Sequence, residues 1–164
     1  MNGEQAESAD RGGNDMPLTS ITKFEHLFRS AATMQVDRND LKRYREFVNQ
    51  KMYDLLVIGQ ATAKANGRDV IEPRDLPITK GLQESINDFK RIDAQIELSP
   101  ILDCVVARPL LEVAVSEDSQ RRLPVIAGGL SVALGRTFKI IDPRTKRPLR
   151  EDWEQVFSIF DLLV

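Results

Sequence analysis

The sequence predicts an all-α protein made of two consecutive copies of one helical unit. Apolar residues recur at steps of three and four over most of the 164 residues, which is the period of an amphipathic helix. Two of these runs are long, and each is followed by a short extended segment and a further helical run. The unit repeats after about 75 residues, which is longer than most solenoid repeats, so we expect two three-helix units packed face to face around one core.

The composition is that of a soluble globular protein. The chain is 41% hydrophobic and 29% charged, with 9 Gly and 8 Pro, which excludes the disordered and collagenous classes. The longest uncharged stretch of the second half, Leu123–Gly135, is shorter than the roughly 20 apolar residues that cross a bilayer. No apolar leader is visible, and the single cysteine, Cys104, cannot form an internal disulfide. We therefore expect a cytoplasmic protein, located at the nucleoid if it binds DNA, with no membrane contact.

Charge is distributed unevenly between the start of the chain and the rest. Residues 1–17 are rich in Gly, Asn, Asp, Glu and Ser, so we expect a disordered acidic tail. Residues 21–164 carry 22 Lys and Arg against 21 Asp and Glu. Because a protein that coats DNA is usually clearly basic, any contact with DNA must come from a local patch of cations.

The first helical unit is predicted over residues 18–95. Thr19 or Ser20 can cap its first helix. Its long helix is capped within Val36–Asp40 and ends at Asn66–Gly67, where glycine tolerates a left-handed backbone best. A short extended bridge follows. The apolar stripes consist of Phe24, Leu27, Phe28 and Ala31 in the first helix, Leu41, Tyr44, Val48, Met52 and Leu55 in the long helix, and Leu82, Ile86, Phe89 and Ile92 in the third.

The second unit is predicted over residues 96–164 and shares its core with the first. Ser99–Pro100 suits the start of a helix, and Ser116 with an acidic first turn opens the second long helix. Asp142–Pro143 ends that helix. The connecting segments are expected at 108–115 and 144–150, and the last helix is marked by Trp153, Val156, Phe157, Phe160 and Leu163.

One loop of the first unit carries a specific pattern. Arg68, Val70–Ile71 and Asp75 are spaced as in the second loop of histones, where the arginine pairs with the aspartate that starts the third helix. The chain from Leu18 to Val164 resembles a bacterial family of tandem, or double, histone-fold proteins catalogued as a domain of unknown function. The segments that carry the resemblance are FEHLFR from Phe24, DLKRY from Asp40, FVN from Phe47, AKANGRDVIEP from Ala63 and GGLSVAL from Gly128.

This resemblance implies two histone-fold motifs in tandem that form an intramolecular pseudo-dimer. It also implies that Arg68 and Asp75 form a structural ion pair. The second unit departs from the pattern, because Asp152 is present but Thr145 stands seven residues before it where an arginine is expected. On the two long helices, Gly59 and Ala127–Gly129 are predicted to let the helices cross closely.

No catalytic or metal motif is present. The sequence has no phosphate-binding glycine loop, no nucleophile elbow and no zinc set, so we expect neither an enzyme nor a cofactor. His26 is expected on the surface of the first helix, and Cys104 is expected to be a small core residue.

A basic cluster near the end of the second long helix is the main functional signal. Six cations lie within 15 residues: Arg136, Lys139, Arg144, Lys146, Arg147 and Arg150. In a histone pair the second loop of one motif lies beside the first loop of the other, which would bring this cluster to the start of the first long helix. The resulting candidate DNA-binding residues are Arg38, Lys42, Arg43, Arg144, Lys146, Arg147 and Arg150. The alternative interpretation of the cluster is a solvated loop.

Two classes of function follow. The first is a non-enzymatic nucleoid-associated protein that binds double-stranded DNA weakly through its phosphates, without sequence preference. The alternative is a protein–protein interaction module whose partner is another protein or a second copy of the chain. The basic cluster favours the first class, whereas the near-neutral net charge and the acidic tail favour the second. Neither class requires a small-molecule substrate.

Overall fold

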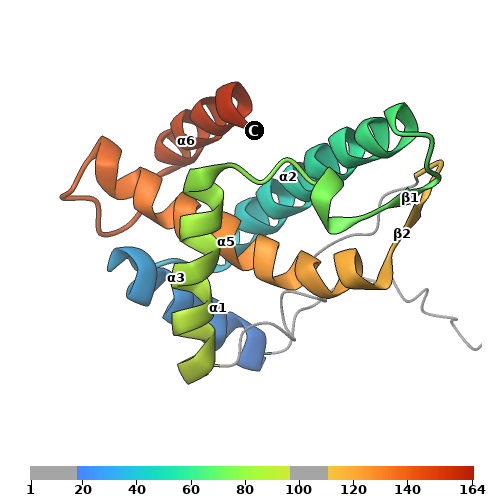
Figure 1. Ribbon diagram of the computed structural model, residues 1–164. Coiled ribbons are helices and arrows are strands. Elements are labelled where there is room, and N and C mark those ends of the chain that lie inside the picture. Colours follow the sequence, from blue (N-terminus) through green and yellow to red (C-terminus); the bar gives the residue numbers. More distant parts are fainter. Residues whose placement is uncertain (1–17, 97–110) are drawn as a thin grey trace, which may run out of the picture.

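The structure, a computed structural model, describes residues 18–96 and 111–164 (Figure 1). The acidic tail, the helix predicted from Ser99–Pro100 and the core position predicted for Cys104 lie outside the described residues.

The described residues form an all-α fold with two short strands, as predicted. In chain order, the first half consists of α1 (Leu18–Ala32), α2 (Arg38–Ala65), β1 (Val70–Ile71), the 3-10 helix η1 (Pro73–Asp75) and α3 (Lys80–Ile96). The described part of the second half consists of β2 (Ala114–Val115), α5 (Glu117–Ile141) and α6 (Arg150–Leu163). In Figure 1, α5 runs through the middle of the molecule, with α1 and α3 on one side and α6 on the other.

The ends of α2 follow from its local sequence. Asp37 is the N-cap, and its side chain accepts a hydrogen bond from the backbone N–H of Asp40 at 2.9 Å. The Asp40 side chain in turn accepts from the backbone N–H of Asp37 at 2.8 Å, which completes a capping box. At the other end, Asn66 caps the helix and Gly67 has φ +69, a left-handed conformation that few other residues adopt easily.

One predicted detail of the helices is wrong. α1 begins at Leu18, so Thr19 and Ser20 lie inside its first turn rather than at its N-cap; capping preference alone leaves a helix boundary uncertain by one or two residues.

The last helix, α6, lies where the sequence predicts it. Trp153, Val156 and Phe160 are buried, whereas Leu163, at the end of the helix, is 72% exposed.

The glycines of α5 do not serve the purpose predicted for them. A Cβ atom on Gly128 would lie 2.3 Å from the ring of Phe89, and one on Gly129 would lie 2.5 Å from the side chain of Ile86. Both neighbours belong to α3, so Gly128–Gly129 allows α3, and not α2, to approach α5. On α2, Gly59 lies against Ile71 and against Asp75 and Leu76 at the end of η1. This position also differs from the predicted crossing of the long helices.

The two long helices are joined by a buried polar contact. The hydroxyl of Tyr44 on α2 hydrogen-bonds to the hydroxyl of Ser131 on α5 at 2.7 Å, and Ser131 also donates to the carbonyl of Ala127 at 2.6 Å. Burial raises the pKa of Tyr44, so the phenol stays protonated. α5 is long and apolar enough to span a membrane by length and composition, but 56% of its most apolar window is buried inside the protein, as in the core helix of a globular fold.

A two-stranded parallel sheet connects the two halves. Val70 pairs with Ala114, and Ile71 pairs with Val115. The backbone N–H of Ser116, the N-cap of α5, donates to the carbonyl of Ile71 at 3.0 Å. The loop after α2 therefore lies beside the segment that precedes α5.

Candidate nucleic-acid interface

At the opposite end of the molecule from the sheet, the loop before α2 lies beside the loop after α5. The backbone N–H of Gln35 donates to the carbonyl of Lys146 at 2.8 Å. The guanidinium of Arg147 donates to the side-chain carbonyl of Gln35 at 3.0 Å. These contacts join residues more than 100 positions apart and bring the predicted cations of both halves to one end of the molecule.

Not all of the predicted cations at this end are free to bind a ligand. Arg43 lies 3.8 Å from Asp40, Arg144 lies 3.2 Å from Asp142, and Arg150 lies 3.0 Å from Glu154. The other four, which we call the basic end, are exposed and have no acidic partner in the part of the chain that the structure describes. The basic end consists of Arg38, Lys42, Lys146 and Arg147.

Two members of the predicted cluster support the loop itself. Asp142 accepts from both the backbone N–H and the guanidinium of Arg144, and these bonds lower the pKa of the Asp142 carboxyl. Lys139 donates to the backbone carbonyl of Thr145. These interactions hold the loop in place and leave its tip, Lys146–Arg147, facing solvent.

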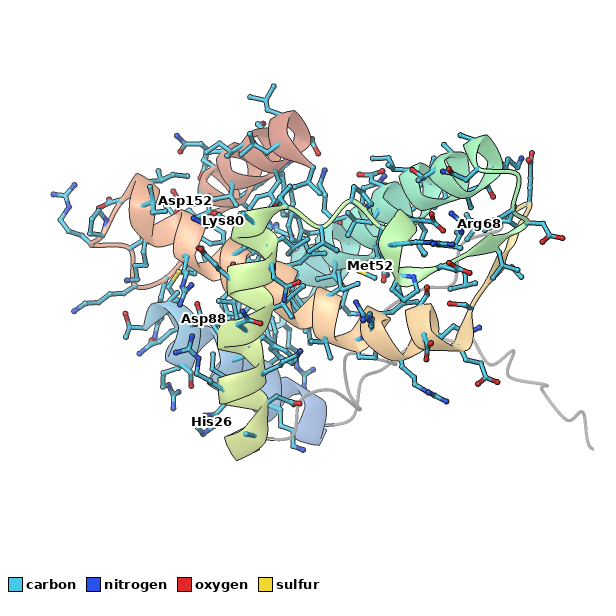
Figure 2. The ribbon with its side chains drawn as sticks, viewed as in Figure 1. His26, Met52, Arg68, Lys80, Asp88 and Asp152 are labelled. Atoms are coloured by element: carbon cyan, nitrogen blue, oxygen red, sulfur yellow. The ribbon has the colours of Figure 1, made fainter. Side chains whose placement is uncertain are left out.

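Arg136 instead joins two helices, because it lies on α5 and pairs with Asp88, labelled on α3 in Figure 2.

A hollow of about 340 Å³ lies next to the basic end. Its walls come from the last turns of α1, the loop before α2, the first turn of α2 and the Arg147–Pro148 segment. Sequence reasoning missed Arg29, which lines this hollow from α1. The signal that could have found it is its position in the last turn of a helix that leads directly into the first loop.

A buried carboxylate forms part of the same hollow. Asp40 is only 4% exposed, and it accepts a hydrogen bond from the indole N–H of Trp153 at 2.8 Å. Desolvation raises the pKa of the Asp40 carboxyl, although the backbone N–H of Asp37 and the indole N–H partly offset that shift. Through this bond, α6 is connected to the start of α2.

The end that carries the sheet is built from paired charges (Figure 2, right). The guanidinium of Arg68 donates to both carboxylate oxygens of Asp75, each at 2.6 Å, so the ion pair that the family resemblance implies is present and is bidentate. Close by, Arg74 pairs with Glu72 at 2.8 Å.

The corresponding aspartate of the second half keeps part of this arrangement. Asp152 accepts from the backbone N–H of Leu149 at 2.7 Å and so caps the start of α6, just as Asp75 accepts from the backbone N–H of Glu72 at 2.8 Å. With Thr145 in place of the arginine, Asp152 has no ionic partner among the described residues.

The Arg68–Asp75 pair predicts an acid-dependent loss of stability. Hydrogen bonding to Arg68 lowers the pKa of Asp75 from 3.8 to about 2 in the folded protein. The carboxylate therefore stabilises the fold above about pH 4, and this contribution is lost as the pH falls towards 2. We expect the Tm of Asp75→Ala to lie about 2–8 °C below that of the wild type near neutral pH. Because the variant lacks the titrating carboxylate, its Tm should fall less than that of the wild type between about pH 4 and pH 2.

Thermal unfolding followed by circular dichroism checks this prediction. Asp69→Ala removes an exposed carboxylate from the same loop and serves as the control, with an unfolding profile expected to match the wild type. If acidification lowers the Tm of Asp75→Ala and of the wild type by the same amount, the Arg68–Asp75 pair is not the source of the acid-dependent loss of stability.

Among the residues described, the side chains considered for catalysis or metal binding form no site. His26 is exposed on α1 (Figure 2). Within residues 18–96 and 111–164, no group of three His, Cys, Asp or Glu side chains is arranged to hold a metal ion.

Comparison with known proteins identifies relatives without an assigned activity. A family model described as a domain of unknown function (DUF1931) matches residues 24–161. An uncharacterized protein from Aquifex aeolicus is 30% identical over 139 residues, which cover 85% of this chain and 81% of the relative.

Two crystal structures are similar to this chain. One is of a Thermus thermophilus protein with 47% identity and a TM-score of 0.79, covering 88% of this chain and 97% of the other. The second is of an Aquifex aeolicus protein with 26% identity and a TM-score of 0.78, covering 96% of this chain and all of the other.

Proposed function

This chain belongs to the DUF1931 family, a domain of unknown function, and we propose that it is a non-enzymatic double histone-fold protein that binds duplex DNA weakly and without sequence preference. The observation that carries the proposal is the contact between Gln35 and Lys146, which unites the cations of the two halves at one end.

The arrangement of the elements supports a histone pseudo-dimer. Each half contributes a long helix, a loop with a short strand and a further helix, and the Tyr44–Ser131 contact joins the long helices in the core. The loop after one long helix lies beside the loop before the other at both ends of the molecule. One such junction is the parallel pairing of β1 with β2, and the other is the Gln35–Lys146 contact.

The distribution of charge supports DNA as the ligand of one end only. The four cations of the basic end have no acidic partner among the described residues, so binding a phosphate does not require an existing ion pair to be broken. At the sheet end, Arg68 and Arg74 are already engaged with carboxylates. A duplex would therefore be held at the basic end rather than wrapped around the molecule, and the near-neutral body makes the binding weak.

A protein-interaction module is the second candidate function. Apolar side chains are exposed on α2 and on the last turn of α6, namely Tyr53, Ile58, Leu162 and Leu163. Exposed apolar side chains of this kind favour a protein partner or a second copy of the chain.

A DNA titration with charge-reversed variants tests the proposal. We expect fluorescence anisotropy with a random-sequence duplex to show saturable binding whose affinity falls with salt, on a log–log slope of about −2 to −4 for the four cations. Reversing Arg38, Lys146 and Arg147 to Glu should abolish that binding and leave the helical signal unchanged, because all three side chains are exposed.

The matched control reverses three exposed cations outside the basic end, Lys80, Lys90 and Arg122, and so changes the net charge equally. Equal loss of binding in both variants would indicate a diffuse charge effect. If the wild type does not bind the duplex at low salt, the protein-interaction module becomes the favoured function.

A further inference from the structure

We propose that the hollow beside the basic end is a binding site for a free nucleotide whose base carries an exocyclic amine. Its volume of about 340 Å³ falls within the range of small-molecule sites. The sequence indicates no such site, because the walls come from segments that are far apart in the chain. The proposal stands apart from DNA binding, since the hollow and its charges exist whether or not a duplex is bound.

One wall of the hollow carries two opposite charges that do not pair with each other. Glu25 and Arg29 are four residues apart on α1, the spacing at which such residues commonly form an ion pair. Both line the hollow, yet neither has a hydrogen-bond or ionic partner for its side chain among the described residues. One wall therefore offers a carboxylate acceptor and a guanidinium donor to whatever occupies the hollow.

A second guanidinium lines the hollow from a different element. Arg147 lines the hollow from the loop after α5, and its described partner is the neutral side chain of Gln35. Arg29 and Arg147 thus approach the hollow from two different elements without a carboxylate bound to either. Two guanidinium groups in this arrangement suit a phosphate, which they can bind through several N–H donors at once.

The remaining surfaces suit a base. Val36 and Pro148 contribute apolar wall area, against which a flat ring can pack. The Glu25 carboxylate needs a hydrogen-bond donor. The exocyclic amines of cytosine, adenine and guanine supply one, whereas uracil and thymine have no exocyclic amine and donate only from their ring N3–H.

The surrounding charge distinguishes a nucleotide from a zwitterion such as a free amino acid. Arg38, Lys42 and Lys146 of the basic end lie on the segments that flank the hollow, and they have no acidic partner in the described part of the chain. The carboxylates of Glu25, Asp37 and Asp40 line the hollow together with Arg29 and Arg147, so with these three cations five positive charges stand against three negative ones. The net positive field favours a ligand with a net negative charge. A nucleoside monophosphate has both this net charge and the donor that Glu25 requires.

The molecule contains its own reporter of occupancy. Asp40 lines the hollow and accepts the indole N–H of Trp153, which is the one tryptophan of the chain. A ligand that changes the electrostatic environment of Asp40 should alter the fluorescence of Trp153.

The test is a titration of the full chain with cytidine monophosphate and uridine monophosphate. Cytosine has an amine on C4 and an acceptor at N3, whereas uracil has an oxo group on C4 and an N–H at N3. Tryptophan fluorescence follows binding, and titration calorimetry measures it independently. We expect cytidine monophosphate to bind about tenfold more tightly than uridine monophosphate, because uracil places an acceptor against the Glu25 carboxylate. Inorganic phosphate should bind more weakly than either nucleotide.

Two variants test which side chain binds the phosphate and which binds the base. Arg29→Gln should weaken both nucleotides by about tenfold through loss of a charged phosphate contact. Glu25→Gln should remove the preference for cytidine, since an amide can donate to uracil as well as accept from cytosine. Arg121→Gln, at an exposed position near the start of α5, is the control and should leave both affinities unchanged.

Three results would overturn the proposal. These are the absence of saturable binding of either nucleotide, inorganic phosphate that binds as tightly as cytidine monophosphate, and a Glu25→Gln variant that keeps the preference for cytidine. Nucleotide binding by a wild-type protein that does not bind duplex DNA would leave this proposal intact and reject only the proposed DNA binding.

Discussion

Replacing Trp153 with alanine should lower the free energy of unfolding by about 3–5 kcal/mol, the largest stability effect that we expect from a single truncation in this protein. The indole is completely buried and packs edge-on against the ring of Phe138, with the centroids 4.9 Å apart. The rings of Phe28 and Phe157 complete the contacts. Truncation leaves a large cavity among these rings and also removes the hydrogen-bond donor of the buried Asp40 carboxylate.

Urea denaturation followed by circular dichroism measures this change. Trp153→Phe helps to separate the two causes, because it removes the N–H donor but retains much of the ring packing; its cost should be about 1–3 kcal/mol. Leu162→Ala, at a largely exposed position of the same helix, should be close to neutral. An alanine variant at Trp153 that loses less stability than the phenylalanine variant would contradict this account.

Replacing Gly129 with alanine should destabilise the fold by about 1–3 kcal/mol or more, although alanine is the better helix former. The added Cβ would lie 2.5 Å from the side chain of Ile86 and 3.0 Å from its backbone nitrogen. A side chain can rotate away, but the backbone of α3 cannot move without disturbing its packing on α5. We therefore expect the close approach of the two helices to be lost.

Gly81→Ala provides the matched control for this substitution. Gly81 also lies in a helix, α3, but nothing lies within 4 Å of the position of its added Cβ. Here alanine should stabilise by about 0.4–1 kcal/mol, through its helix propensity and the reduced freedom of the unfolded chain. Equal changes of stability at Gly81 and Gly129 in denaturation experiments would rule out the close contact with α3 as the cause.

The candidate interface was predicted in part. The sequence places the cations of the basic end in loops and at the start of a long helix, and these positions follow from capping and turn residues. Their separation into paired and unpaired cations was not predictable, because it depends on acidic groups in the folded structure. Arg144 is occupied by Asp142, while Arg147, three residues later, contacts only the neutral Gln35 among the described residues. Arg29 was missed because α1 by itself shows no reason to face the second loop.

For the helices that the structure describes, the order, the type and most of the boundaries could be predicted from local sequence signals. Asp37, Gly67 and Ser116 act on backbone groups a few residues away, so these signals can be read locally. The tertiary structure alone decided which faces meet. It places α3 against Gly128–Gly129, and it buries the amine of Lys51 2.7 Å from Asp161, which is 110 residues away. The physical reason is that close packing and ion pairing depend on distances between segments remote in the chain, which local periodicity does not encode.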